Sequence, residues 1–243
     1  MAYACRGGQC IIRSMTSDVS DLPTEAASGG GVTRDDVICV VGAGSVGLVT
    51  AACLAEMGNT VRLLETDPVR LEALREGRAP IFEPGLEELL HTVIDEGRFE
   101  ATDYAAAAVS GAGIVFIAVG TPSRPDGTAD LSQVRTAAAD VSAVAAGSTV
   151  LVIKSTVPPG TTASLRSPRP GGRPPLATVA CPEFLREGSA LEDFRSLIAG
   201  ITRAAQPSRW ANAATWSSAP WARRIDAITA APACSLHGGA RSR

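Results

Sequence analysis

The stretch VICVVGAGSVGLVTAACLAEMG, from Val37 to Gly58, determines the fold class of this chain. Its first five residues are apolar and are followed by glycine, which is typical of a strand buried on both faces. The next residues, SVGLVTAACLAE, have helical spacing, and Gly58 is well placed to end that helix. A buried strand, a glycine-rich turn and a helix in this order predict the first unit of a parallel α/β sheet.

Strands alternate with helices through the rest of residues 37–200. We predict strands in NTVRLLETD, GAGIVFIAVGTP, STVLVIK and LATVACPEF, and helices in DPVRLEALREG, EPGLEELLHTVIDEG and DLSQVRTAAADVSAVAA. This alternation predicts a doubly wound parallel sheet, which is a Rossmann-type α/β fold. Ligands of such sheets bind at the carboxyl ends of the strands, and the unusual turns of this sequence fall there.

The turn after the first strand has the spacing G-x-G-x-x-G, formed by Gly42, Gly44 and Gly47. The spacing alone is weak evidence. Here, however, it follows a strand, opens a helix and precedes a second strand that ends in Glu65. Gly42 permits the tight turn, Gly44 lets the backbone approach a pyrophosphate, and Gly47 lets helix and strand pack closely. This context predicts a dinucleotide-binding site.

The rest of the predicted cofactor site lies close to this turn in the sequence. The amides of the helix N-terminus, at Ser45 and Val46, are expected to receive the phosphate charge. Glu65 is placed to accept a hydrogen bond from a ribose 2′-hydroxyl and would repel a 2′-phosphate, so we predict NAD rather than NADP. Arg70 is a candidate for the adenosine end, and the alternative is a solvated helix charge.

Four later motifs carry a resemblance to a known family: GRAPIFEPGLEELL (77–90), VGTPSRPDGTADLSQV (119–134), VIKSTVPPGTT (152–162) and CPEFLREGSALEDF (181–194). In order and spacing they resemble the N-terminal domain of the UDP-glucose/GDP-mannose dehydrogenase family, over about residues 37–195. The first and last motifs are more similar to its UDP-glucose branch. Another Rossmann dehydrogenase, such as a hydroxyacyl-CoA type, would share the glycine spacing but not the third and fourth motifs together.

This resemblance implies an enzyme that oxidises the C6 alcohol of UDP-glucose to a carboxylate with two NAD+, through a thiohemiacetal and a thioester on a cysteine. Thr121 and Ser123 would line the nicotinamide side of the cofactor, and Thr156 would hold a catalytic water. The residues implied in proton transfer and hydrolysis are Glu183 and Glu187. The segment implied in contacts with the sugar nucleotide consists of Glu183, Phe184, Leu185, Arg186 and Glu187.

The two glutamates also have an ordinary structural interpretation. Four residues apart on a helix, Glu183 and Glu187 would share a face and reach one pocket. There a partly dry cleft and mutual repulsion would raise a carboxyl pKa toward that of a useful base. Spacing alone favours helix-terminal acids next to Pro182 at the first helical position, stabilised by the helix dipole. Only the family resemblance reverses this preference.

Charge and cysteine usage exclude several classes of function. The net charge is −3, with +5 in residues 201–243 and therefore −8 before them, so we expect neither nucleic acid nor a membrane surface as a partner. The six cysteines form no C-x-x-C pair, which argues against a metal site or a disulfide framework. The chain offers no apolar run of signal-peptide length. These observations favour a cytoplasmic protein.

Two end segments differ from the predicted domain. Residues 1–36 are rich in Ser, Gly, Asp and Thr and are expected to be a disordered leader. Residues 201–243 are irregular, and their shift to Arg, Ala, Trp, Ser and Pro resembles out-of-frame translation; the alternative is a basic tail. The family's central helical domain, nucleophilic cysteine, catalytic lysine and UDP-binding domain have no match here. We therefore expect a cofactor-domain fragment of a homodimeric family, prone to aggregation.

Overall fold

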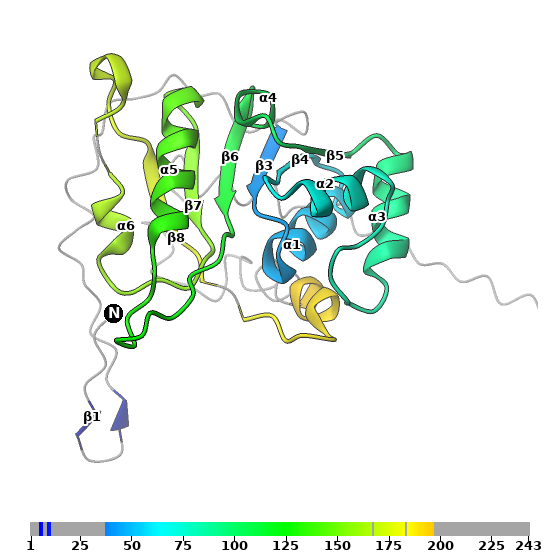
Figure 1. Ribbon diagram of the computed structural model, residues 1–243, viewed down its shortest axis with the longest axis horizontal. Helices are drawn as coiled ribbons and strands as arrows, with labels where there is room; N and C mark the ends of the chain where they lie inside the picture. The colour runs from blue at the N-terminus through cyan, green and yellow to red at the C-terminus, as the bar shows by residue number, and fades with distance from the viewer. Residues whose placement is uncertain (1–4, 7–8, 11–36, 167, 183, 197–243) are drawn as a thin grey trace, which may run out of the picture.

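The computed structural model describes residues 5–6, 9–10, 37–166, 168–182 and 184–196. Its main element is a parallel sheet of six strands in the order β5-β4-β3-β6-β7-β8 (Figure 1). The strands are β3 (Val37–Val41), β4 (Thr60–Leu64), β5 (Phe99–Thr102), β6 (Ala112–Ile117), β7 (Val150–Ile153) and β8 (Ala177–Ala180). This is the strand order of the doubly wound dinucleotide fold, with the switch point between β3 and β6, and it confirms the predicted fold class.

A short antiparallel pair, β1 (Cys5–Arg6) and β2 (Gln9–Cys10), lies outside this sheet. The rest of the predicted leader, residues 1–4, 7–8 and 11–36, lies outside the described residues, as does the predicted tail at 201–243. The predicted Rossmann domain is therefore seen from residue 37 to residue 196.

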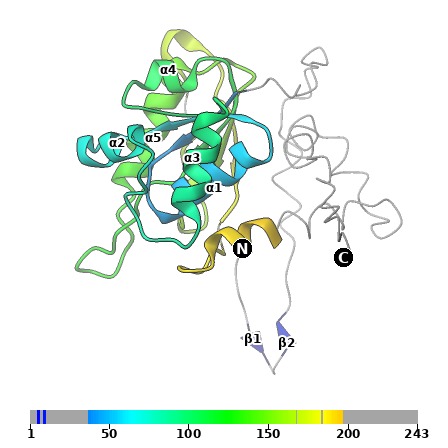
Figure 2. The same cartoon turned by 90° about the vertical axis from the view of Figure 1, so that its right-hand side faces the viewer.

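Helices cover both faces of the sheet (Figures 1 and 2). They are α1 (Ser45–Glu56), α2 (Pro68–Arg75), α3 (Leu86–Asp95), α4 (Ala105–Val109), α5 (Ser132–Val144) and α6 (Thr161–Ser164), with a 3-10 turn, η1 (Pro170–Gly172). One apolar cluster joins α1 and α3 to the sheet, and a second joins α4 and α5 to its other face. Since parallel strands are buried on both faces, their sequences are nearly continuous apolar runs, as predicted.

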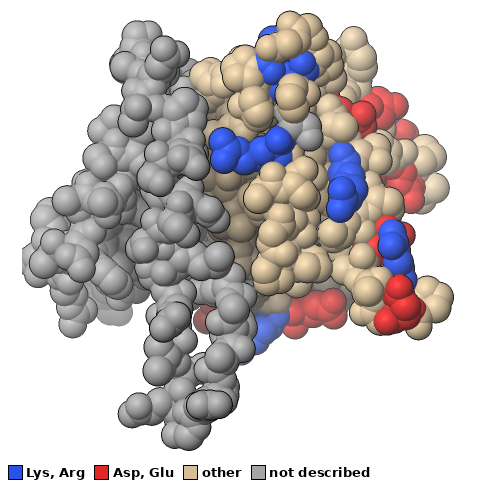
Figure 3. All heavy atoms as spheres, turned by 90° about the vertical axis from the view of Figure 1, so that its left-hand side faces the viewer, with Lys and Arg blue, Asp and Glu red and all other residues tan. Residues whose placement is uncertain are grey.

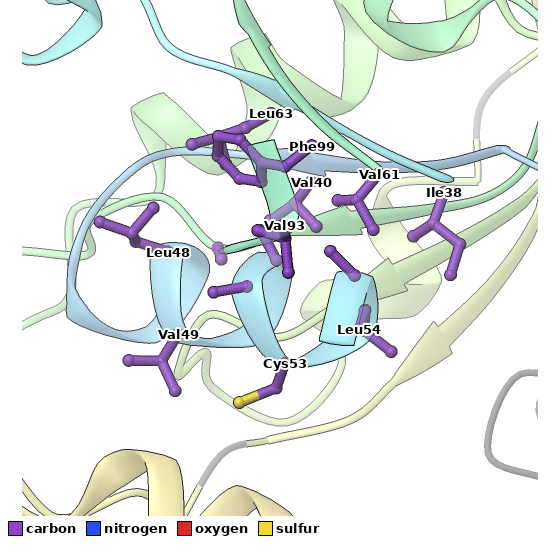
Figure 4. Close-up of a cluster of buried hydrophobic side chains, with 14 of the residues drawn as sticks. Ile38, Val40, Leu48, Val49, Cys53, Leu54, Val61, Leu63, Val93 and Phe99 are labelled. Atoms are coloured by element: carbon purple, nitrogen blue, oxygen red, sulfur yellow. The ribbon is translucent and has the colours of Figure 1, made fainter. Parts of the chain in front are cut away.

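Strand β3 shows how the two clusters share one strand. Ile38 and Val40 belong to the cluster under α1, whereas Cys39 and Val41 belong to the cluster under α5 (Figure 4). Burial raises the pKa of the Cys39 thiol to about 12, and that of Cys53 in α1 to about 12. Both cysteines are thus buried, protonated thiols of the core.

The sequence reasoning missed several short elements, among them strand β5 and helix α4. In β5 only Phe99 is buried, because the strand lies at the edge of the sheet. Helix α4 has five residues, four of them alanine, and is too short for a helical period to be recognised. Their pairing with β4 and packing with α5 become visible only in the folded chain.

The C-terminal end of α5 is capped by two arginines that lie 27 and 30 positions after the carbonyl groups they bind. Arg169 Nε donates to the Ser142 carbonyl at 2.8 Å, and Arg173 Nη2 donates to the Ala143 carbonyl at 2.7 Å. Cations are favourable at this end of a helix because its carbonyls are unpaired and the dipole is negative there. On the side of the molecule drawn in Figure 3, the basic side chains form no single patch, and some of them lie beside acidic ones.

The chain after β8 crosses the sheet. Residues 181–196, which we call the crossing segment, run from β8 at one edge of the sheet to a helix at 190–196 beside α1; residue 183 is outside the described part. Figure 1 shows this segment in yellow along the edge toward which the arrowheads of β3 and β6 point. The helix buries Ala190, Leu191 and Phe194 in the same apolar cluster as α1 and α3.

Candidate functional site

The glycine-rich turn has three different glycine environments. Gly42 has φ +101°, and its amide donates to the Leu64 carbonyl at 2.9 Å. A Cβ on Gly47 would lie 1.9 Å from the Gly42 carbonyl oxygen, so only glycine fits there. The backbone of Gly44 is extended and unstrained, and a Cβ added there would meet nothing within 4 Å. Two glycines thus shape the turn, while the third leaves open space at the start of α1.

That open space has the features of a phosphate site. Gly44 is the N-cap of α1, Ser45 is exposed and Val46 is half-buried. Because the first amides of a helix have no intrahelical partner, those of α1 are available to an anion, and the dipole favours one. Gly44 keeps the backbone clear, so a pyrophosphate can approach these amides closely.

Glu65 follows β4 and joins the two turns of the cofactor site. Its side chain is 7% exposed. Oε2 accepts from the Ala43 amide at 2.8 Å, and Oε1 accepts from the amides of Thr66 at 2.7 Å and Asp67 at 2.8 Å. Each carboxylate oxygen has two lone pairs, so Oε2 keeps one for a ribose hydroxyl. Glu65 therefore fits its predicted role and also holds the glycine-rich turn against β4.

Arg70 lies in the first turn of α2 and is exposed. The Asp67 side chain caps this helix by accepting from the amides of Val69 and Arg70 at 2.9 and 3.2 Å. Arg70 is thus near Glu65 in the chain, but its side chain forms no hydrogen bond or ion pair with the other described residues. Its assignment to the adenosine end stays a prediction.

The turns after β6 and β7 are joined by two hydroxyl groups. Thr121 Oγ1 donates to the Thr156 carbonyl at 3.0 Å, and Ser155 Oγ donates to the Val119 carbonyl at 2.7 Å. The Thr156 side chain is exposed, and Thr121 is half-buried. Ser123 is exposed and lies opposite Ala129 in an isolated antiparallel bridge. The structure therefore brings Thr121 and Thr156 together at the carboxyl edge.

The side chains of the crossing segment face several directions. Phe184 is 77% exposed, while Leu185 is half-buried against the α1 cluster. Arg186 is held by Asp193: Nε donates to Oδ2 at 3.0 Å and Nη2 donates to Oδ1 at 2.7 Å. Glu187 is exposed. Glu183, predicted as its catalytic partner, lies outside the described residues.

The expectation of one helix face for the two glutamates is wrong. Residues 184–186 have no regular structure, 187–188 form a turn, and the helix begins at residue 190. Gly188 has φ +80°, which breaks a right-handed helix, and the first helical bond runs from the Asp193 amide to the Ser189 carbonyl at 2.9 Å. Glu187 therefore lies before the helix in a turn, and Pro182 does not open it.

Sequence reasoning also missed the residues that anchor this segment. Glu83, in the turn before α3, accepts from the amides of Gly188 and Ala190 at 2.8 and 2.7 Å. Glu56 at the end of α1 pairs with Arg195, Oε1 to Nη2 at 2.7 Å and Oε2 to Nε at 3.0 Å. The EPG turn was recognised as a helix start, but no local signal connects it with residues more than 100 positions later.

Two residues with reactive side chains, Lys154 and Cys181, lie near this edge. Lys154, the only lysine of the chain, is 4% exposed directly after β7. Cys181 is exposed, and its amide donates to the Ile153 carbonyl at 2.9 Å, which extends the pairing of β8. Among the described residues no three His, Cys, Asp or Glu side chains are grouped as a metal site would require. No described helix is both long and apolar enough to cross a bilayer.

Comparison with known proteins agrees with the interpretation of the glycine-rich turn as a dinucleotide site. Residues 36–202 match the NAD-binding domain model of the UDP-glucose/GDP-mannose dehydrogenase family. The chain is 48% identical over 164 residues to a UDP-glucose 6-dehydrogenase of Pseudomonas aeruginosa, covering 65% of this chain and 36% of that protein.

Solved structures give the same result. A UDP-glucose dehydrogenase from Pyrobaculum islandicum is 43% identical, with a TM-score of 0.61 over 68% of this chain and 40% of its own. A GDP-mannose dehydrogenase from Pseudomonas aeruginosa is 31% identical, with a TM-score of 0.57 over 65% of this chain and 38% of its own. The chain thus spans little more than a third of the length of these relatives. Its glycine-rich turn, its buried carboxylate and the matched domain agree that it belongs to the UDP-glucose/GDP-mannose dehydrogenase family and contains that family's NAD-binding domain.

Proposed function

We propose that this chain supplies the NAD site and one wall of the nucleotide-sugar site of an enzyme that oxidises UDP-glucose to UDP-glucuronate. The observation that carries the proposal is the path of the crossing segment. Its described residues, 181–182 and 184–188, lie along the same carboxyl edge as the glycine-rich turn. A substrate bound against it would lie beside a cofactor bound at β3 and β6, as hydride transfer demands.

The side chains at this edge have roles that fit such a reaction. Bound NAD would accept the two electrons removed in each oxidation. Thr156, exposed beside Thr121, would hold the water that attacks the acyl intermediate, and Ser123 would line the nicotinamide side. Glu187, exposed in its turn, would take a proton from that water together with Glu183. The backbone of residues 184–187 would contact the sugar nucleotide.

The proposal requires a nucleophilic thiol from another part of the protein. Cys39 and Cys53 are buried, and their thiols have a pKa of about 12, so neither forms a thiolate near neutral pH. Cys181 is exposed, but the family resemblance does not make it the nucleophile. We therefore propose that turnover needs a thiol outside residues 37–196. The homodimer that the family resemblance implies would need the same thiol in order to turn over.

Two observations favour alternatives. The buried thiols favour a chain that binds NAD without turnover. The likeness to a GDP-mannose dehydrogenase favours another nucleotide sugar as the ligand. Both alternatives use the same cofactor site, so the nucleotide sugar is what separates them from the main proposal.

Isothermal titration of the whole chain distinguishes these functions. We expect saturable binding of NAD+ and much weaker binding of NADP+, then binding of UDP-glucose, but not GDP-mannose, to the NAD+-loaded chain. Preference for GDP-mannose would show that the substrate is GDP-mannose and not UDP-glucose. Binding of NAD+ with neither sugar nucleotide would favour the non-catalytic function.

Formation of NADH, followed at 340 nm with UDP-glucose, tests turnover. Where turnover is found, Glu187→Gln should lower it strongly, whereas Glu192→Gln, an exposed acid on the helix of the same segment, should not. Equal activity of both variants would remove Glu187 from the proposed mechanism.

A further inference from the structure

We propose that Glu83 is a positioning residue that sets the place of the crossing segment, and with it the wall of the nucleotide-sugar site. The inference rests on the proposed function for the identity of that site. The contacts themselves do not depend on it. Glu83 lies in the turn between α2 and α3, two helices that pack against the edge strand β5. The crossing segment starts at β8, the edge strand on the opposite side of the sheet.

The first argument is the hydrogen bonding of the Glu83 carboxylate. Glu83 is 8% exposed, and both of its oxygens accept amide bonds from one short stretch: Oε2 from Gly188 at 2.8 Å and Oε1 from Ala190 at 2.7 Å. Ala190 is the first residue of the helix at 190–196, where amides have no intrahelical partner. Glu83 is thus a helix cap supplied from a residue 107 positions earlier.

The second argument is the strength of these bonds. A charged acceptor forms shorter and stronger hydrogen bonds than a neutral one, and low exposure strengthens them further. The positive end of the helix dipole adds a favourable interaction with the carboxylate. Removing the carboxylate would leave the Ala190 amide without a partner in a buried place and the Gly188 amide without one in a partly buried place, and the first loss is the costlier.

The third argument is the close packing around the bonds. Gly85, two residues after Glu83, has φ +78°, and a Cβ built on it would lie 3.7 Å from Leu191 Cδ1. Leu191 itself is 5% exposed in the α1 cluster. Leu191 thus lies beside the EPG turn, which bonds through the Glu83 carboxylate to Gly188, in the turn before the helix, and to Ala190 at the start of the helix.

The consequence concerns Glu187 and the backbone before it. The turn that carries Glu187 lies between two anchors, Glu83 at Gly188 and the Arg186–Asp193 pair. With Glu83 removed, the end of this turn loses its fixed position while the glycine-rich turn keeps all of its own contacts. Loss of Glu83 should therefore weaken binding of the nucleotide sugar and spare binding of NAD+.

The experiment uses the whole chain with Glu83→Gln and Glu83→Ala, and Glu88→Gln as the control, an exposed acid on α3 whose side chain contacts none of these amides. Amide exchange of residues 186–191 is measured by mass spectrometry, and NAD+ and UDP-glucose binding by calorimetry. Glutamine keeps one acceptor oxygen, so the effect of Glu83→Gln on exchange and binding should be intermediate. This variant still tests the role of the carboxylate if Glu83→Ala fails to fold.

We expect exchange at 186–191 to rise about tenfold in Glu83→Ala and less in Glu83→Gln, since a hydrogen bond to a charged group is worth about one power of ten or more. UDP-glucose affinity should fall by a similar factor, with NAD+ affinity unchanged within about twofold, as expected for a site without shared contacts. A general loss of stability would instead raise exchange throughout the domain and weaken both ligands.

Unchanged exchange at 186–191 in both variants would overturn the inference. So would parallel losses of NAD+ and UDP-glucose affinity. Increased local exchange in a chain whose wild type binds no nucleotide sugar would support the positioning role and refute the proposed function, which separates the two failures.

Discussion

In the proposed function the glycine-rich turn and the crossing segment form two walls of one site, yet they are held in place in different ways. The turn is held by neighbours: Glu65 bonds to Ala43, 22 positions away, and to the two residues that follow it. The crossing segment is held by Glu83 and Glu56, 105 to 139 positions away. The first wall is therefore built by one β-α-β unit, whereas the second requires the complete domain.

Substituting the glycines should have the largest effects and should separate folding from binding. Gly47→Ala places a Cβ 1.9 Å from the Gly42 oxygen, so we expect about 3 kcal/mol or more of lost stability and no NAD+ binding. Gly44→Ala meets no atom of the protein and should fold normally, but its methyl group occupies the space a pyrophosphate needs. Urea unfolding and NAD+ titration measure both. Normal NAD+ binding by Gly44→Ala would show that the pyrophosphate does not bind at this turn.

Substituting Glu65 should have the next largest effect. Glu65→Ala leaves the buried Ala43 amide without an acceptor, so we expect about 2 kcal/mol of lost stability. Discrimination against NADP+ should fall as well, because the repelling carboxylate is gone. Glu72→Ala, an exposed acid of α2, is the control in urea unfolding and in titration with both cofactors. Preserved selectivity for NAD+ would show that Glu65 only supports the turn.

This contrast explains what could be predicted from the sequence. The fold class and the candidate cofactor residues follow from apolar periods and from G-x-G-x-x-G, signals that span about thirty residues. The helix expected at Pro182 was wrong because the start of the real helix depends on Gly188 and on a cap from Glu83. A carboxylate 107 positions away leaves no periodic signal, and the short elements β5 and α4 leave too little of one.

A smaller effect is expected at the far end of the crossing segment. Arg195 and Glu56 form a two-bond ion pair, but their side chains are 51% and 39% exposed, so solvent screens the attraction. Arg195→Ala should cost only about 0.5 kcal/mol. Amide exchange of residues 190–196 should rise slightly, and NAD+ affinity should not change. A loss as large as that of Glu65→Ala would mean that this end of the helix, and not its start at Glu83, anchors the segment.

The smallest effect should be a pH dependence confined to the crossing segment. Hydrogen bonds from Arg186, first from its side chain and then from its backbone amide, lower the pKa of Asp193 to about 2 from an ordinary 3.8. Because the folded pKa is the lower one, the pair contributes fully above pH 3.8 and is lost as pH falls through about 2. Exposure of Arg186 makes this contribution small.

Carboxyl chemical shifts of Asp193 and amide exchange at 186–193, followed between neutral pH and pH 2, measure this dependence. Asp193→Asn should lose the acid transition and show weaker protection at every pH, because an amide cannot accept both guanidinium bonds as a carboxylate does. The glycine-rich turn has no equivalent pair and should stay protected until the whole domain unfolds. An Asp193 carboxyl that titrates near its ordinary pKa would show that the pair does not persist in solution, leaving Glu83 as the anchor that holds Glu187 in place.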